Sequence, residues 1–318
     1  MTATTTAPLR EDTIRLADGR KIGFAEYGDP EGVPLLWFHG TPGARGQIPP
    51  RARIDAAERG VRIIAVERPG TGQSTGHLHG AMVDWAGDVE QIADALGLER
   101  FGVAGLSGGG PYALACAHEL PHRVVAGMVL GGVAPTTGPD AAPGGIVRLA
   151  AYAEPILSLI TVPLGVALTV FARAVRPFAS QAFDLYKHIS PEGDKRVFEQ
   201  PGMKEMFTGD LIRAGKHQLA APAYDIVLFG RHWGFSLQDI EVPIRFWHGD
   251  SDNLVPLEHA EHQAALVPDS ELRVRPGESH LGGFDAFGEI IDQLLDLWER
   301  ANGEAATTEA TDTATAKG

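Results

Sequence analysis

The stretch Phe101–Gly109 (FGVAGLSGG) decides the fold of this 318-residue chain. Its first six residues, Phe101–Leu106, predict a buried strand, and residues 112–120 predict a helix. Between them, residues 105–109 fit G-x-S-x-G, a sharp strand-to-helix turn that exposes a serine. Glycines at the outer positions prevent a collision of side chains across the turn. We expect Ser107 to be a nucleophile on this bend; with 39 glycines in the chain, an ordinary turn is the alternative.

Apolar runs and helical patterns alternate on both sides of this turn. Strands that are apolar on both faces and alternate with helices indicate a mostly parallel central sheet with helices on both faces. The predicted fold class is therefore α/β. The predicted strands are residues 20–27, 33–38, 61–66, 101–106, 124–130, 242–247 and 272–274, and the predicted helices are residues 48–59, 82–96, 112–120, 257–265 and 287–298.

The alternation stops between about residues 133 and 235, where the sequence predicts helices without strands. The simplest account is a helical insertion that folds over the α/β core as a cap. The last segment holds only small, polar and charged residues and cannot bury enough apolar surface to become ordered. The predicted organisation is a flexible tail (1–12), a core (13–133 and 236–301), a helical cap (134–235) and a disordered tail (302–318).

Composition excludes several classes of function. The net charge of −14 repels a phosphate backbone, so nucleic acid is not an expected partner. The single cysteine, Cys116, rules out an internal disulfide framework and a cysteine-rich metal site. The first residues show no secretory signal, which predicts a cytoplasmic protein. The expected partner is a small-molecule substrate; the sequence does not predict an oligomeric state.

Three further segments follow predicted strands, at the edge where doubly wound sheets place their ligands. The turn His39–Gly43 can present the backbone N–H of Thr41 to an oxyanion, beside the N–H of Gly108. The loop of residues 249–256 carries two aspartates, Asp250 and Asp252, either of which could orient a histidine. The third segment carries such a histidine, His280.

Taken together, HGTPG (39–43), ERPGTGQS (67–74), GLSGG (105–109), GDSDNLVP (249–256) and GESH (277–280) make the chain resemble the α/β-hydrolase superfamily. The resemblance extends over residues 14–300. It implies a catalytic triad of Ser107, Asp252 and His280, selecting Asp252 over Asp250, and an oxyanion hole of the Thr41 and Gly108 N–H groups. It further implies a serine esterase of small or medium apolar esters, with no cofactor and no metal.

Other reactions use the same triad. Prolyl iminopeptidases are similar but have a glycine where this chain has Thr41, which weakens an aminopeptidase interpretation. A C–C bond hydrolase, a perhydrolase, a lyase and a hydrolase-fold receptor for a small ligand remain open. Haloalkane dehalogenases and epoxide hydrolases carry an aspartate at the position of Ser107, so the serine argues against both.

The remaining motifs have structural interpretations. Residues 155–172 are uncharged but contain two prolines, and a transmembrane span there would separate Ser107 from His280. We instead expect a cap helix that lines an acyl pocket, with weak contact to lipid surfaces as a further hypothesis. His259 and His262 have helical metal-ligand spacing, but a solvated helix face is favoured. The expected roles of the other conspicuous residues are core packing for Cys116 and organisation of the core strands for Arg68 and Ser74.

Overall fold

The computed structural model of the chain describes residues 7–142 and 149–315, and only the backbone for residues 304–315. Its centre is a sheet of eight strands in the order β1-β2-β4-β3-β5-β6-β7-β8. The strands from β3 to β8 run parallel, whereas β2 pairs antiparallel with both β1 and β4. The strands are β1 (Arg10–Arg15), β2 (Lys21–Gly28), β3 (Val33–Phe38), β4 (Val61–Val66), β5 (Phe101–Leu106), β6 (Val124–Leu130), β7 (Ile244–Gly249) and β8 (Ser270–Arg275).

Helices cover both faces of this sheet, which confirms the predicted α/β fold class. On one face lie α1 (Pro50–Glu58) and α10 (Phe287–Thr315). The other face carries α2 (Trp85–Ala95), α3 (Gly110–Glu119) and α9 (Leu257–Leu266). Every residue of β5 and β6 is buried, as expected for strands between two helical layers.

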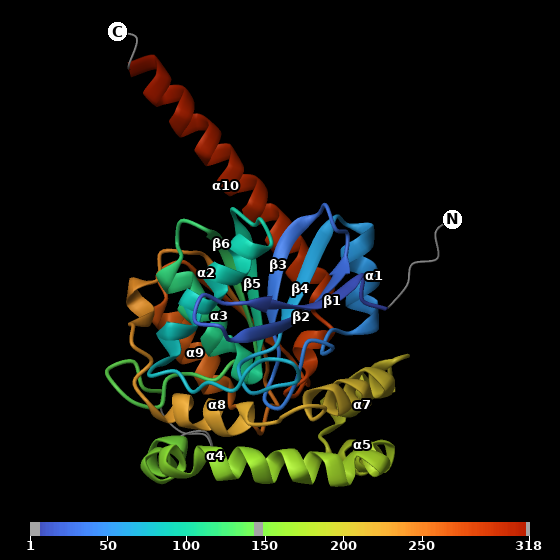
Figure 1. The fold of residues 1–318 in the computed structure, drawn as a ribbon. Coiled ribbons are helices and arrows are strands. Elements are labelled where there is room, and N and C mark those ends of the chain that lie inside the picture. Colours follow the sequence, from blue (N-terminus) through green and yellow to red (C-terminus); the bar gives the residue numbers. More distant parts are fainter. Residues whose placement is uncertain (1–6, 143–148, 316–318) are drawn as a thin grey trace.

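The insertion between β6 and β7 consists of helices in the part that the structure describes. They are α4 (Leu149–Val175), α5 (Ala179–Ile189), α6 (Glu192–Glu199), α7 (Met203–Ala214) and α8 (Ala221–Gly230). Figure 1 shows α4 and α5 as the outermost layer of the molecule, with α7 and α8 between them and the sheet. Residues 143–148 of the predicted cap lie outside the described residues.

Both ends of the core differ from the sequence-based expectation. Strand β1 begins at Arg10, inside the segment predicted as a flexible tail. Only Ile14 of this strand is buried, and the strand is held by backbone pairing with β2. Helix α10 continues to Thr315, through most of the segment predicted to be disordered, and projects from the body (Figure 1). The alanines and glutamates of that segment have high helix propensity, so a helical backbone forms there without adding to the core.

Candidate active site

The turn after β5 has the strained geometry that a G-x-S-x-G motif requires. Ser107 has a φ of +52°, a left-handed conformation that is rare outside glycine, and α3 begins three residues later. A Cβ atom on Gly105 would lie 2.2 Å from the carbonyl oxygen of Gly109, and one on Gly109 would lie 2.2 Å from that of Phe38. The turn therefore tolerates only glycine at these two positions, and it presents the Ser107 hydroxyl at the end of the strand.

Three side chains from separate loops meet at this serine. The Ser107 Oγ lies 2.8 Å from Nε2 of His280, in the loop after β8. The Nδ1 atom of His280 lies 2.7 Å from Oδ2 of Asp252, in the loop after β7. Asp250, the competing aspartate, is exposed and instead accepts hydrogen bonds from the Gly277 N–H and the Ser251 hydroxyl. The three loops meet because β5, β7 and β8 are parallel and end at the same edge of the sheet.

Asp252 is buried and held by several hydrogen bonds. Its Oδ1 accepts hydrogen bonds from the backbone N–H groups of Leu254 (2.8 Å) and Val255 (2.9 Å). The buried side chain of His248 also approaches it, with Nε2 3.4 Å from Oδ2 of Asp252 and 2.7 Å from the Val255 carbonyl oxygen. Burial raises the pKa of Asp252, but hydrogen bonds from His248 and His280 outweigh burial and hold this pKa well below its ordinary value. His248 was not predicted, because its only signal in the sequence is its position at the end of β7.

Thr41 and Gly108 lie against each other beside Ser107. A Cβ atom on Gly108 would stand 2.3 Å from Oγ1 of Thr41, so only glycine allows this approach. The turn that carries Thr41 is fixed by His39, which is buried and contacts the Gly40 carbonyl oxygen through Nδ1 at 2.8 Å. Burial, and then the charge of Arg68, lowers the pKa of His39 well below its ordinary value, so its imidazole is neutral.

A buried ion pair joins this turn to the insertion, and no motif in the sequence predicts it. The Arg68 guanidinium donates to both carboxylate oxygens of Asp225, at 2.7 Å and 3.2 Å, and also to the carbonyl oxygens of His39 and Gly40. Asp225, on α8, also accepts hydrogen bonds from the Thr41 hydroxyl and the Tyr112 hydroxyl, the latter at 2.6 Å. Arg68 thus contacts the Thr41 turn instead of the core strands. Ser74 does join core segments, because it bonds to the Gly23 N–H and to the Glu67 carbonyl oxygen.

A second buried carboxylate of the insertion holds the same loop further along. Asp210, on α7, accepts hydrogen bonds from the backbone N–H groups of Ala44 and Gly46, each at 2.8 Å. Burial raises the pKa of Asp210 to about 6, although the Ala44 N–H and the charge of Arg213 act in the opposite direction. Two helices of the insertion are therefore bonded to the loop that bears Thr41.

A largely apolar cavity of about 720 Å³ lies above Ser107, between the core and the insertion. The core lines it with Thr41, Ser107 and His280. The insertion contributes mainly Leu149, Ala150, Ala153, Ala179, Ala182, Phe183, Tyr186, Phe207, Ile226 and Phe229. None of the described lining residues comes from residues 155–172, so this apolar run does not line the pocket as predicted. The helix that contains the run, α4, does line it, through Leu149, Ala150 and Ala153. The run packs on α8 with one side and is exposed on the other.

The other candidate residues have structural surroundings. His259 is buried, and its Nδ1 accepts a hydrogen bond from the Ala134 N–H at 3.1 Å, so the prediction of a solvated helix face is wrong at this position. His262 is partly buried and contacts the Asp140 carbonyl oxygen. Cys116 packs in the core, where burial raises the pKa of its thiol. Within residues 7–142 and 149–303, no three histidine, cysteine or acidic side chains form a metal-binding group.

The chain is similar to known proteins of one family. The model of the alpha/beta hydrolase fold family matches residues 33–287. The bifunctional esterase/perhydrolase of Acinetobacter calcoaceticus is 28% identical over 274 residues, 84% of this chain and 92% of that protein. A proline iminopeptidase of Neisseria meningitidis is 30% identical over 129 residues, 40% of this chain and 41% of that protein. The structure of an esterase from Exiguobacterium antarcticum superposes with a TM-score of 0.64 at 22% identity, covering 90% of this chain and 98% of that one.

Proposed function

Because this chain belongs to the alpha/beta hydrolase fold family, we propose that it is a serine hydrolase that cleaves carboxylic esters of apolar molecules. The observation that carries the proposal is the chain of contacts from Ser107 Oγ through His280 to Asp252, at 2.8 Å and 2.7 Å, beneath an apolar cavity. This arrangement joins a nucleophile, a base and the group that orients the base.

The reaction begins with attack of the Ser107 oxygen on the ester carbonyl carbon. His280 accepts the hydroxyl proton through Nε2, and Asp252 stabilises the resulting imidazolium through Nδ1–H. The backbone N–H groups of Thr41 and Gly108 donate to the oxyanion, and one such donor contributes about 3–4 kcal/mol to lowering the barrier. His280 then gives its proton to the departing alcohol, which leaves an acyl group on Ser107. Water, deprotonated by His280, attacks this acyl group. The bond to Ser107 then breaks, His280 returns the proton to the Ser107 oxygen, and the carboxylic acid leaves.

The carboxylates around the cavity favour an ester over an N-terminal peptide. A peptide amine needs an acidic partner, but Asp210 already accepts two backbone N–H groups. Asp225 is occupied by Arg68, Thr41 and Tyr112. The described residues that line the cavity include no carboxylate besides Asp210, so an aminopeptidase would bury the ammonium group of its substrate without a partner.

A series of p-nitrophenyl esters of graded acyl length tests the proposal, with an aminoacyl anilide for comparison. We expect hydrolysis of the esters, with a preference for chains longer than acetyl that fill the cavity, and none of the anilide. Ser107→Ala abolishes both turnover and labelling by a fluorophosphonate, which bonds to the serine oxygen with loss of fluoride. Ser180→Ala, a change at an exposed serine of α5, is the matched control and keeps both. Faster cleavage of the anilide than of any ester contradicts the proposal, as does a wild-type chain without fluorophosphonate labelling.

Perhydrolysis is a second candidate reaction, favoured by the esterase/perhydrolase relative. Here hydrogen peroxide replaces water, attacks the acyl group on Ser107 and releases a peracid. Addition of hydrogen peroxide to the ester assay, with detection of the peracid, distinguishes the two outcomes.

A further inference from the structure

The outer side of the insertion is an apolar surface. Among the residues whose exposure is described, thirteen of the eighteen exposed large hydrophobic side chains belong to residues 149–189. Leu159 is 83% exposed, Ile189 71% and Ile156 66%. Two of the thirteen, Leu149 and Tyr186, line the cavity above Ser107. We call the surface formed by the other eleven the cap face; its members are Tyr152, Ile156, Leu159, Ile160, Val162, Val166, Val170, Phe171, Phe178, Leu185 and Ile189.

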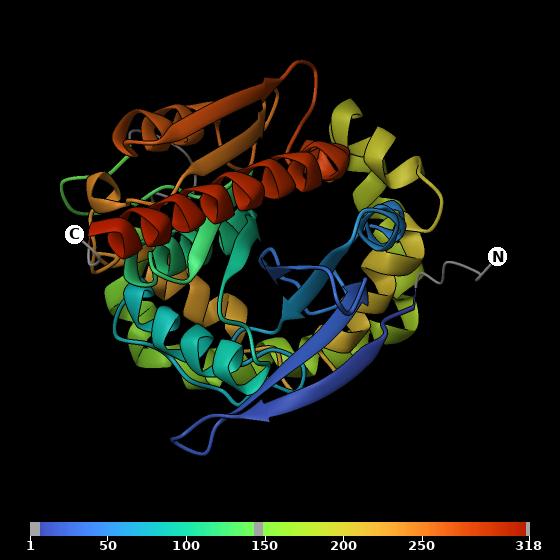
Figure 2. The ribbon, with the colours of Figure 1, turned by 90° about the horizontal axis from the view of Figure 1, so that it is seen from above.

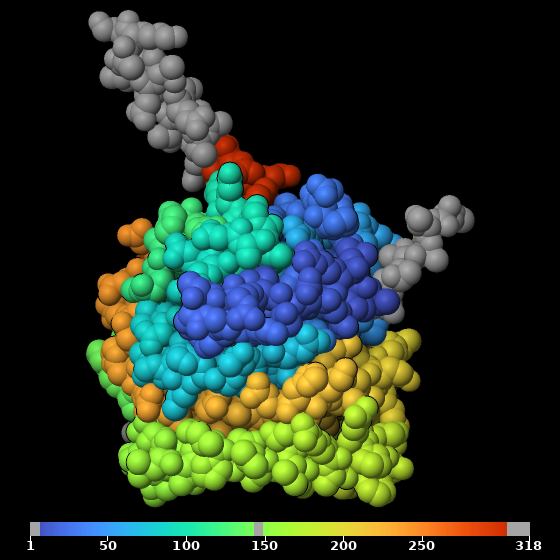
Figure 3. Space-filling model, in the orientation of Figure 1, coloured from blue at the N-terminus to red at the C-terminus, as the bar shows by residue number. Residues whose placement is uncertain are grey.

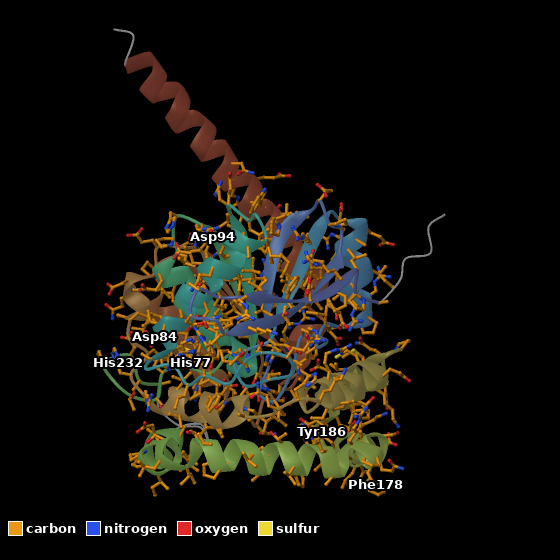
Figure 4. The ribbon with its side chains drawn as sticks, in the orientation of Figure 1. His77, Asp84, Asp94, Phe178, Tyr186 and His232 are labelled. Carbon is orange, nitrogen blue, oxygen red and sulfur yellow. The ribbon has the colours of Figure 1, made fainter. Side chains whose placement is uncertain are left out.

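Along α4, most of the exposed large side chains lie three or four residues from another one, as on one broad stripe of a helix. The opposite side of α4 carries the small buried residues Ala150, Thr161 and Gly165. A Cβ atom on Gly165 would lie 2.7 Å from the Cβ of Ala220, so α4 packs closely on the segment that leads into α8. Because that side meets the protein, the large side chains on the other side point away from it. Figure 3 shows residues 149–189 as a continuous outer layer of the molecule, and Figure 4 places Phe178 on its outer side.

The apolar stretch has the composition of a segment that enters lipid. Helix α4 and its continuation to Ile189 are long and apolar enough to cross a membrane, with a mean hydropathy of 2.1 in the most apolar 18-residue window. A crossing would separate the chain before α4 from the chain after it, yet Ser107 and His280 touch at 2.8 Å. The helix therefore fits a membrane only when it lies in the plane of the surface, with its exposed stripe among the acyl chains.

The charges along this segment fit a lipid surface. Its two acidic residues are neutralised within the protein, because Glu154 pairs with Arg231 at 2.8 Å and Asp184 pairs with Lys204 at 2.6 Å. Arg173 and Arg176 are exposed at the end of α4. A protein with a net charge of −14 therefore has two exposed arginines beside its apolar face. Exposed Tyr152 adds an aromatic side chain typical of the membrane–water interface. Exposed Phe171 and Phe178 are typical of the apolar face of an interfacial helix.

We propose that the cap face docks on the surface of a lipid bilayer, with Arg173 and Arg176 beside anionic headgroups. Docking places the cavity above Ser107 close to the lipid, because Leu149, Ala153 and Ala182 of the same two helices line that cavity. A helix is only about 10 Å across, so roughly one helix diameter separates the cavity from the bilayer.

Flotation of the full-length chain with vesicles tests the proposal, using phosphatidylcholine with and without phosphatidylglycerol. The double variant Leu159→Glu/Val166→Glu puts two charges on the cap face. Its matched control is Leu9→Glu/Val274→Glu, which makes the same replacements away from the cap face. Leu9 lies beside β1 and is 52% exposed, and Val274 lies on β8 and is 41% exposed. Circular dichroism and thermal unfolding verify that each variant is folded, and the oligomeric state of each is measured by light scattering.

We expect the wild-type chain and the control variant to float with the vesicles. The cap-face variant loses about a hundredfold in partitioning, or tenfold for each apolar side chain that no longer enters the lipid. Arg176→Gln weakens binding to vesicles with phosphatidylglycerol by about fivefold and leaves binding to pure phosphatidylcholine unchanged. Equal partitioning of the two double variants overturns the proposal, as does a wild-type chain that does not float. The proposal is also overturned if the wild-type chain is a dimer that does not bind vesicles and if Leu159→Glu/Val166→Glu dissociates this dimer. The cap face is then covered by a second copy of the chain. These outcomes are independent of hydrolysis, so they separate docking from the proposed reaction.

Discussion

The buried ion pair between Arg68 and Asp225 leads to a prediction that joins the insertion to catalysis. Asp225→Asn keeps the shape of the side chain but removes its charge, and both partners are only 1% exposed. Loss of one partner of a buried pair costs about 3–5 kcal/mol, since the other charge remains buried without compensation. The amide oxygen still accepts from one donor, so we expect a loss at the lower end, about 3 kcal/mol, in the free energy of unfolding measured in urea.

The same change should slow catalysis. Asp225 binds the Thr41 hydroxyl directly, and Arg68 binds the carbonyl oxygens of His39 and Gly40. An amide group that turns a donor toward Arg68 or Thr41 displaces the turn and moves the Thr41 N–H away from the oxyanion. A correctly placed donor of this kind contributes about 3–4 kcal/mol. Partial misplacement should lower kcat/KM for a p-nitrophenyl ester by about tenfold to a hundredfold, mainly through kcat.

Two further variants separate positioning from stability. Tyr112→Phe removes another hydrogen bond to Asp225 but leaves the ion pair and the Thr41 contact, so it should cost about 1 kcal/mol of stability and little activity. Arg68→Met/Asp225→Leu replaces the pair by apolar side chains and should recover much of the stability while kcat stays low. If Asp225→Asn is destabilised as expected and yet hydrolyses the ester with the kcat of the wild type, the ion pair does not position the Thr41 turn for catalysis.

Four other substitutions have defined outcomes. Glu67 is buried beside Arg45, and burial raises its pKa to about 7, so the folded state holds this proton more tightly than the unfolded chain. This proton therefore stabilises the folded state fully below about pH 4, and that stabilisation is lost as the pH rises through about 7. In Glu67→Gln, the free energy of unfolding measured in urea should decline less between pH 5 and 8 than in the wild type. Gly105→Ala should prevent folding of the turn, because the new Cβ atom would lie 2.2 Å from the Gly109 carbonyl oxygen. Gly87 lies in α2, and a Cβ atom there would have no neighbour within 4 Å, so Gly87→Ala should stabilise the chain by about 0.5–1 kcal/mol in thermal unfolding. His248→Ala should lower kcat with little change in KM, since the imidazole contacts Asp252 and lies outside the described cavity lining; an altered KM with an unchanged kcat would contradict a positioning role.

The central sheet was predictable because its strands carry a strong local signal. Strands such as β5 and β6 are apolar at almost every position, and only a strand between two helical layers requires this. Strand β1 has the sequence REDTIR, in which only Ile14 is buried, so it lacks the apolar pattern and was missed. Its place at the edge of the sheet depends on backbone pairing with β2, which leaves no local pattern in the sequence.

The residues of the site divide in the same way. Ser107, Asp252 and His280 were found because each lies in a short motif directly after a strand, and the sheet then brings the three loops together. Asp225 lies on a helix of the insertion, 157 residues from Arg68 in the sequence. Its one signal is a lone charge in the apolar stretch APAYDIVLFG, which indicates a buried partner but does not identify it. Identifying Arg68 as that partner requires the position of α8 over the turn.

The apolar run 155–172 shows where hydrophobicity alone is ambiguous. The same residues would serve in a buried helix, in a pocket wall or at a membrane surface. From the sequence we expected a pocket wall, with weak contact to lipid surfaces as a further hypothesis. The structure separates these cases, because small residues such as Gly165 meet the protein while large ones such as Leu159 and Val166 point outward. The close packing of α4 depends on the small residues, so polar residues at the exposed positions would leave that packing intact. The fold therefore does not require apolar side chains at these positions. The proposed contact with lipid would explain why they are apolar.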